Sequence, residues 1–183
     1  MTELLTWVFA ALFVLVIIAW YLSYTAARLD RLHVRLGGTL AALDARLVRR
    51  AEVAVELAHS GLLDGATSLL LASAAGESLE APAEHGEARE QAESDLTEAL
   101  DLTLTPAVVQ SLRETPQGQD LVERVESACT RVQLARRFHN DAVTDVRRVR
   151  RKWTIRMFHL AGHTPMPHTI EFNDDSPDHL ALV

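Results

Sequence analysis

The sequence predicts an all-α protein in which an N-terminal transmembrane helix precedes an antiparallel, up-and-down helical bundle. Three observations predict this class. Residues 4–27 form an uncharged, mostly apolar run. Leucine and alanine recur at helical spacing in the segments that follow, and no alternating strand pattern is present. Aromatic residues, which favour strands, make up only 5% of the chain.

The run 4–27 has the composition of a membrane-spanning helix. At ~1.5 Å per residue, about 20 residues cross the ~30 Å hydrocarbon layer of a bilayer. Trp7 lies near one end of the run and Trp20 and Tyr24 near the other, as in the aromatic belts of membrane proteins. A core helix of a soluble domain would carry a polar face, and a cleaved signal peptide would begin with basic residues. We therefore assign residues 1–27 to a transmembrane anchor.

The charges that flank the anchor predict its orientation. Glu3 is the only charged side chain before the run. The residues that follow it are rich in arginine, namely Arg28, Arg31, Arg35, Arg46, Arg49 and Arg50, against Asp30 and Asp44. The positive-inside rule keeps such a flank in the cytoplasm. We expect a single-pass protein of the plasma membrane with its N-terminus outside and its bundle in the cytoplasm.

Residues 28–161 are predicted to form the bundle. One apolar row follows the anchor at spacings of three and four: Leu29, Leu32, Leu36, Leu40, Leu43, Leu47, Ala54 and Leu57. Gly37 and Gly38 lie within this row and lower its helix propensity, so a hinge is expected at this position. Because Gly61 then breaks the pattern, we expect four helices, with three as the alternative.

The later helices are predicted from caps and apolar rows. After a turn at 77–82, a helix over 83–102 carries an acidic outer face. Thr105-Pro106 and Thr115-Pro116 read as helix starts, with a short helical turn between them. A long helix is predicted from Gln117 to about Leu160. The tail, 162–183, contains three prolines and several acids, and we expect it to be mostly disordered.

Two stretches of the bundle resemble the LemA family of membrane proteins. Residues 43–50, Leu-Asp-Ala-Arg-Leu-Val-Arg-Arg, resemble its L-D-x-x-L-x-R-R segment. Residues 135–143, Ala-Arg-Arg-Phe-His-Asn-Asp-Ala-Val, resemble its A-R-R-x-Y-N-D-A-V segment, with His139 in place of tyrosine. The helix around Glu93 and Leu96 also fits. The resemblance covers about 29–160 and implies a membrane-anchored bundle with no firmly attached enzymatic activity, although the family's closing segments match this chain poorly.

The sharpest polar cluster is Arg136, Arg137, Asn140 and Asp141. We interpret it mainly as an internal network, with Asp44, Arg46 or the acids of 83–102 as partners, and alternatively as a docking site. The segment 147–158 is basic and contains aromatic residues, which predicts contact with the inner leaflet. The candidate interaction residues are therefore Arg136, Arg137, Asn140, Asp141, Arg147, Arg148, Arg150, Arg151 and Trp153.

Enzymatic and cofactor motifs are absent from the sequence. It has no P-loop, dinucleotide-binding glycine motif, zinc-protease motif or nucleophile elbow. His159, His163 and His168 straddle glycine and proline, so we expect no metal site there. The single cysteine, Cys129, lies on an apolar row and is predicted to be a buried, inert thiol.

The function predicted from these features is a membrane-anchored, non-enzymatic scaffold or adaptor that presents its bundle to protein partners or to the inner leaflet. A sensor or regulatory subunit of a membrane complex, jointed at Gly37 and Gly38, is the alternative. An enzyme is a third class. The net charge of −7 argues against nucleic acid as a partner, and we expect no cofactor.

Overall fold

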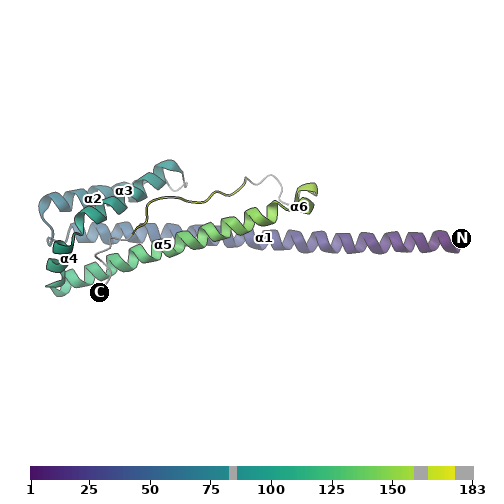
Figure 1. Cartoon of the computed structure of the whole chain (residues 1–183), viewed down its shortest axis with the longest axis horizontal. Helices are drawn as coiled ribbons and strands as arrows, with labels where there is room; N and C mark the ends of the chain where they lie inside the picture. The colour runs from purple at the N-terminus through teal and green to yellow at the C-terminus, as the bar shows by residue number, and fades with distance from the viewer. Residues whose placement is uncertain (83–85, 159–164, 176–183) are drawn as a thin grey trace. The chain divides into compact units, whose positions relative to one another are not determined.

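Residues 1–82, 86–158 and 165–175 are described by a computed structural model, and the regular elements among them are all helices. The all-α prediction is confirmed. The predicted leucine-row helix corresponds to α1, and the helices predicted over 83–102 and from Gln117 correspond to α3 and α5. The helices, labelled in Figure 1, are α1 (Thr2–Ala58), α2 (Gly65–Glu80), α3 (Glu87–Thr103), α4 (Pro106–Arg113), α5 (Pro116–Arg150) and α6 (Trp153–Met157).

The chain divides into two compact units, and the long helices α1 and α5 contribute to both. The anchor unit consists of Met1–Gly38 and Asp141–His168. The bundle unit consists of Thr39–Asn140 and Thr169–Val183. In each unit the statements below concern its described residues. α1 continues through Gly37 and Gly38 without a break, and the boundary between the units falls directly after Gly38.

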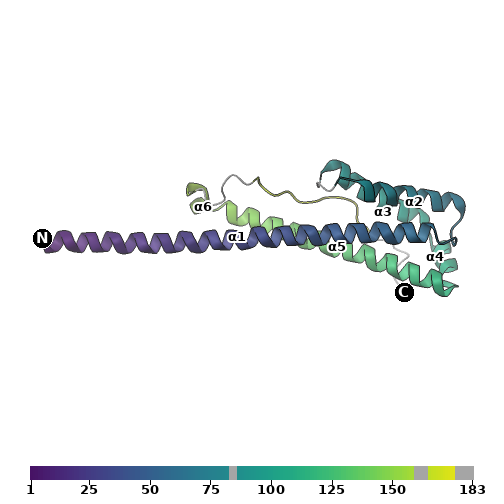
Figure 2. The ribbon, with the colours of Figure 1, turned by 180° about the vertical axis from the view of Figure 1, so that it is seen from behind.

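The bundle unit is an up-and-down arrangement of helices. α2 and α3 lie side by side, as both ribbon views show (Figures 1 and 2). α1 and α5 run antiparallel, because Glu56 late in α1 pairs with Arg124 early in α5, whereas Thr39 meets His139 at 3.4 Å. Short connections between helices of opposite direction give this topology.

Local sequence explains where these helices begin and end. After α1, Gly61 has a φ of 74°, a left-handed conformation that favours glycine. The carboxylate of Asp64 then accepts hydrogen bonds from the backbone N–H groups of Ala66 and Thr67, which caps α2. The predicted start of α4 is confirmed, because the hydroxyl of Thr105 caps the helix and Pro106 occupies its first turn.

Two apolar clusters fill the bundle. The larger contains fully buried leucines from α1, α2 and α3, including Leu57, Leu71 and Leu96, and buried residues of α5. Burial of each such side chain contributes roughly 1.5–3 kcal/mol. The smaller cluster joins Leu43 and Leu47 of α1 to Val132 of α5, and Ile170 and Phe172 from near the C-terminus pack on it.

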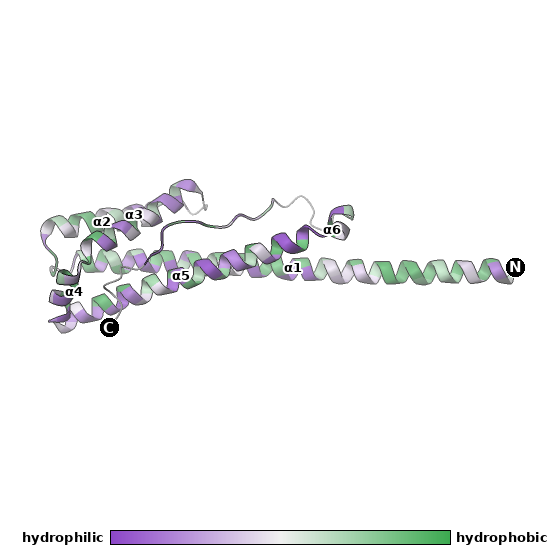
Figure 3. Ribbon diagram, viewed as in Figure 1, coloured by the Kyte–Doolittle hydropathy of each residue, from purple (hydrophilic) through white to green (hydrophobic). Residues whose placement is uncertain are grey.

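The anchor unit contains the apolar part of α1. An 18-residue window of this helix has a mean hydropathy of 2.4 and none of it is buried, so length and composition suffice to cross a membrane. Figure 3 shows the hydrophobic colour along this part of α1. After the apolar stretch of α1, Leu29 is buried against Val149 and Ile155, and Arg35 pairs with Asp145 at 3.9 Å.

Three predicted boundaries differ from the structure. α2 continues to Glu80 instead of turning at residue 77, because the side chain of Ser78 is buried and donates to Glu93. The last long helix ends at Arg150 instead of near 160: Lys152 is extended, and α6 follows with Ile155 buried against Leu29. α3 begins at Glu87, and residues 83–85 lie outside the described part.

The predicted tail, 162–183, is described in part. Residues 169–175, called here the 169–175 segment, follow an extended path in which Ile170 and Asp174 are buried. Their apolar side chains cover the smaller core cluster, and their polar groups are hydrogen-bonded to α3 and α5. Residues 165–168 belong to the anchor unit, and 162–164 and 176–183 lie outside the described residues.

Two glycines test the packing of the helices. A Cβ at Gly118 would overlap the carbonyl oxygen of Leu112, whereas a Cβ at Gly76 in α2 would meet nothing within 4 Å. Gly118→Ala is therefore expected to destabilise the chain by about 1–3 kcal/mol through overpacking. The matched change Gly76→Ala is expected to stabilise it by about 0.5–1 kcal/mol. Denaturant unfolding of both variants measures this, and equal effects would contradict the packing described.

Candidate functional site

A buried carboxylate lies at the centre of the bundle. Glu93 on α3 is 0% exposed. One of its carboxylate oxygens accepts from Arg50 of α1 at 2.8 Å. The other forms an ion pair with Arg89 at 3.0 Å and accepts a hydrogen bond from the hydroxyl of Ser78 on α2 at 2.9 Å. A buried charge costs several kcal/mol unless it is paired and hydrogen-bonded, and Glu93 has both kinds of partner.

The two guanidinium groups around Glu93 bind further groups of the bundle. Arg50 donates to the hydroxyl of Thr97 at 2.9 Å and to the backbone carbonyl of Glu93 at 2.9 Å. Arg89 donates to the carbonyls of Ser78 at 3.0 Å and Ala81 at 3.3 Å, at the end of α2. The network therefore connects α1, α2 and α3 and fixes their register.

The 169–175 segment closes this network through an aromatic ring. The guanidinium carbon of Arg50 lies 5.9 Å from the ring centre of Phe172, and that of Arg136 lies 5.6 Å from it. Both are cation–π distances, and such contacts strengthen when they are desolvated. Phe172 thus links the buried pair of α1 and α3 to α5.

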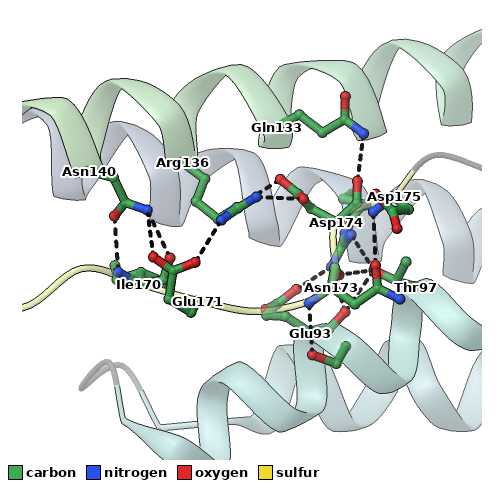
Figure 4. A network of polar contacts seen from close by, with 12 residues as sticks. Glu93, Thr97, Gln133, Arg136, Asn140, Ile170, Glu171, Asn173, Asp174 and Asp175 are labelled. Atoms are coloured by element: carbon green, nitrogen blue, oxygen red, sulfur yellow. Dashed lines mark hydrogen bonds and ion pairs between the residues drawn. The ribbon is translucent and has the colours of Figure 1, made fainter.

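Several backbone groups of the segment are hydrogen-bonded to α3 and α5, and the close-up in Figure 4 shows them at Ile170 and Asn173. The side chain of Asn140 accepts from the N–H of Ile170 at 3.0 Å and donates to its carbonyl at 3.1 Å. Thr97 donates to the carbonyl of Asn173 at 2.7 Å, and the N–H of Asn173 donates to Ser94 at 3.1 Å. The side chains that form these hydrogen bonds with the backbone of the segment come from α3 and α5.

Arg136 binds the acidic side chains of the segment. Its Nε and Nη2 atoms donate to the two oxygens of Asp174 at 2.8 and 2.7 Å, and Nη1 donates to Glu171 at 3.2 Å. Hydrogen bonding to Asp174 raises the pKa of Arg136 above its usual range. Two parallel bonds to one carboxylate are among the stronger ion pairs in proteins.

These contacts give Arg136 and Asn140 partners that the sequence did not suggest. Glu171 and Asp174 bind Arg136, and Glu171 and the backbone of Ile170 bind Asn140. An acid of α3 does take part, because Glu90 accepts from the N–H of Glu171 at 3.3 Å. Arg137 and Asp141, predicted with them, are exposed and lie outside this network.

The predicted basic residues lie in the anchor unit. Arg147 donates to the carbonyl of Pro167 at 2.8 Å, and Arg150 donates to that of Pro165 at 2.8 Å. Arg148, Arg151 and Trp153 are exposed. Of the nine predicted residues, Arg136 and Asn140 bind the 169–175 segment, Arg137 and Asp141 lie outside that network, and the other five precede or begin α6 in the anchor unit.

The arrangement suits recognition of an extended peptide. It offers paired donors and acceptors for a backbone, a guanidinium for acidic side chains and two cations for an aromatic ring. Cys129 is buried as predicted, and burial raises the pKa of its thiol, which keeps it protonated and poorly nucleophilic. The described residues contain no group of three or more His, Cys, Asp or Glu side chains that could hold a metal, and His159 and His163 lie outside them.

Sequence reasoning missed Arg50, Glu93, Thr97 and Phe172. A signal for the first two was present: Arg50 stands three residues after Leu47 and four before Ala54, on the apolar row itself. Glu93 stands three residues before Leu96 and seven before Leu100, which is also helical spacing. A charge on an apolar row predicts a buried ion pair, because only a paired charge is tolerated there.

Comparisons with known proteins give no relative for this chain. No family model, curated protein or solved structure matches it.

The hold of α5 on the segment can be tested at Asn140. Asn140→Ala removes both hydrogen bonds to Ile170, each worth about 1 kcal/mol. Amide exchange at Ile170 is expected to accelerate by about fivefold or more, since about 1.4 kcal/mol is a factor of ten. Arg137→Ala, an exposed change on the same helix, serves as the control. Unchanged exchange at Ile170 in the Asn140 variant would show that α5 does not hold the segment.

Proposed function

We propose that this chain is a membrane-anchored, non-enzymatic scaffold or adaptor of LemA-like organisation. The observation that carries the proposal is that one helix, α1, contains both an unburied apolar stretch and a bundle-forming stretch. The first has the properties of a membrane span, and the second packs into a folded unit. A protein built in this way holds its bundle at a membrane surface.

The anchor is supported by exposure and composition together. A core helix of a soluble domain would bury its apolar residues, whereas none of the most apolar window of α1 is buried. Trp20 and Tyr24 stack with ring centres 6.2 Å apart near the end of the run. Aromatic pairs of this kind are typical of the membrane–water interface.

The adaptor role is supported by the binding surfaces of the bundle. Groups of α3 and α5 already hold one extended peptide, the 169–175 segment. Beside it lies a cleft of about 750 Å³ with acidic residues of α3 and the 169–175 segment in its wall, Asp95, Glu98, Asp101 and Asp175. An acidic cleft of this size suits a basic segment of a partner protein.

The orientation proposed is a single span of the plasma membrane with the bundle in the cytoplasm. It follows from the arginine-rich flank after the apolar run. A regulatory or sensor subunit is the second candidate. The boundary of the two compact units after Gly38 favours it, because a joint at that position would let the bundle respond to events at the anchor.

Topology is tested with a single reactive cysteine. Cys129→Ala removes the native thiol, and Gln110→Cys places a new one at an exposed position of α4, away from the acidic cleft. In intact cells a membrane-impermeant thiol reagent is expected to leave the bundle unlabelled and to label it after lysis. The Cys129→Ala variant alone is the blank. Labelling of intact cells would place the bundle outside the cell. Recovery of the chain in the soluble fraction would refute the proposed transmembrane anchor.

The adaptor role is tested by reversing the charge of the cleft. Complexes of the native chain and of the variant Asp95→Lys, Glu98→Lys, Asp101→Lys are purified in mild detergent after crosslinking. A partner retained by the native chain and lost from the variant is the expected result, because basic groups are then repelled. Reversal of three exposed arginines, Arg46, Arg131 and Arg137, to Glu is the control. Identical partners in all three samples, or none, would contradict a role for the cleft.

A further inference from the structure

Basic residues gather where the apolar run of α1 ends. Within residues 28–38 and 141–158 of the anchor unit there are nine arginines and lysines against three acids. The chain as a whole has a net charge of −7, so the charge of this region is opposite in sign to that of the whole chain. One of the acids, Asp145, is paired with Arg35 at 3.9 Å. The region is therefore strongly positive.

α6 is fixed beside the end of the apolar run. Ile155 is 1% exposed and packs with Leu29 of α1 and Val149 of α5. Leu29 stands two residues after Ala27, the last residue of the uncharged run. At ~1.5 Å per residue this separation is about 3 Å along the helix axis. In Figure 1, α6 lies close to this part of α1.

The side of α6 that does not pack is apolar and exposed. Trp153 is 70% exposed, Met157 48% and Phe158 41%. Arg151, Lys152 and Arg156 stand among them and are exposed as well. Tryptophan among basic side chains is the composition of segments that lie in the headgroup layer of a membrane.

The chain around α6 is held in place by backbone contacts. Arg147 and Arg150 donate to the carbonyls of Pro167 and Pro165, so these two guanidinium groups form hydrogen bonds within the anchor unit. Arg148, Arg151, Lys152 and Arg156 remain on the surface. The surface that they form with Trp153, Met157 and Phe158 is called the α6 patch.

We propose that the α6 patch is a second membrane contact, which binds anionic phospholipid headgroups beside the anchor. The proposal rests on the membrane anchoring proposed above. The charge of the patch is complementary to that of an anionic leaflet, and its position is continuous with the end of the span. Its apolar side chains enter the headgroup layer while its arginines and lysine bind phosphate.

Fluorescence of Trp153 in the full chain tests the proposal. Trp7→Phe and Trp20→Phe leave Trp153 as the only tryptophan. The chain is reconstituted into phosphatidylcholine vesicles with and without phosphatidylglycerol, and lipids brominated near the headgroup serve as quenchers. In the anionic vesicles we expect a blue shift and strong quenching of Trp153, both reduced by high salt because the attraction is electrostatic.

Charge variants locate the effect. Arg148→Gln, Arg151→Gln and Arg156→Gln together are expected to lower quenching in anionic vesicles to the level of neutral vesicles. The matched control, Arg46→Gln, Arg131→Gln and Arg137→Gln, removes three exposed arginines from the bundle unit and is expected to leave quenching unchanged. Circular dichroism verifies the helix content of both variants.

The outcomes separate this inference from the proposed function. A chain that floats with the vesicles while Trp153 emits as in water keeps the anchor and refutes the α6 patch. Equal quenching in neutral and anionic vesicles, or equal loss in both triple variants, also refutes it. A chain that fails to float with vesicles refutes the anchor and the α6 patch together.

Discussion

The bundle depends on one buried carboxylate and the two guanidinium groups that bind it. Glu93 has no contact with solvent, and Arg50 and Arg89 are nearly as buried. Removing Glu93 would leave both guanidinium groups buried without their carboxylate, at a cost of about 3–5 kcal/mol. Because Arg50 comes from α1 and Ser78 from α2, the position of Glu93 on α3 sets the register of three helices.

The path of the 169–175 segment follows from the same network. Phe172 lies over Arg50 of the buried pair and over Arg136 of α5, and Asp174 forms two hydrogen bonds with Arg136. Three arginines and three acids therefore balance in the combined network of Arg50, Arg89, Arg136, Glu93, Glu171 and Asp174. The segment completes the bundle by covering charges and the apolar cluster around Leu43 and Leu47.

Local patterns in the sequence predicted the helices but not the network. The apolar run, the leucine row and the cap at Thr105 depend on neighbours in the chain, so spacing reveals them. The contact of Arg136 with Asp174 joins residues 38 apart, and the acids and prolines around it resemble a solvated tail. The end of α5 at Arg150 escaped prediction because it is set by packing of Ile155 on α1, which no local signal encodes.

The most direct measurement is a double-mutant cycle on the buried pair. Arg50→Met and Glu93→Leu are made singly and together, and the free energy of unfolding is measured with denaturant. Glu93→Leu is expected to cost about 3–5 kcal/mol because it leaves Arg50 and Arg89 buried without their carboxylate. Arg50→Met is expected to cost less, because Arg89 and Ser78 still bind Glu93. The double variant is expected to lose less than the sum, by roughly 1–3 kcal/mol, as contacting residues do. Additive losses would show that Arg50 and Glu93 act independently and that the pair does not organise the bundle.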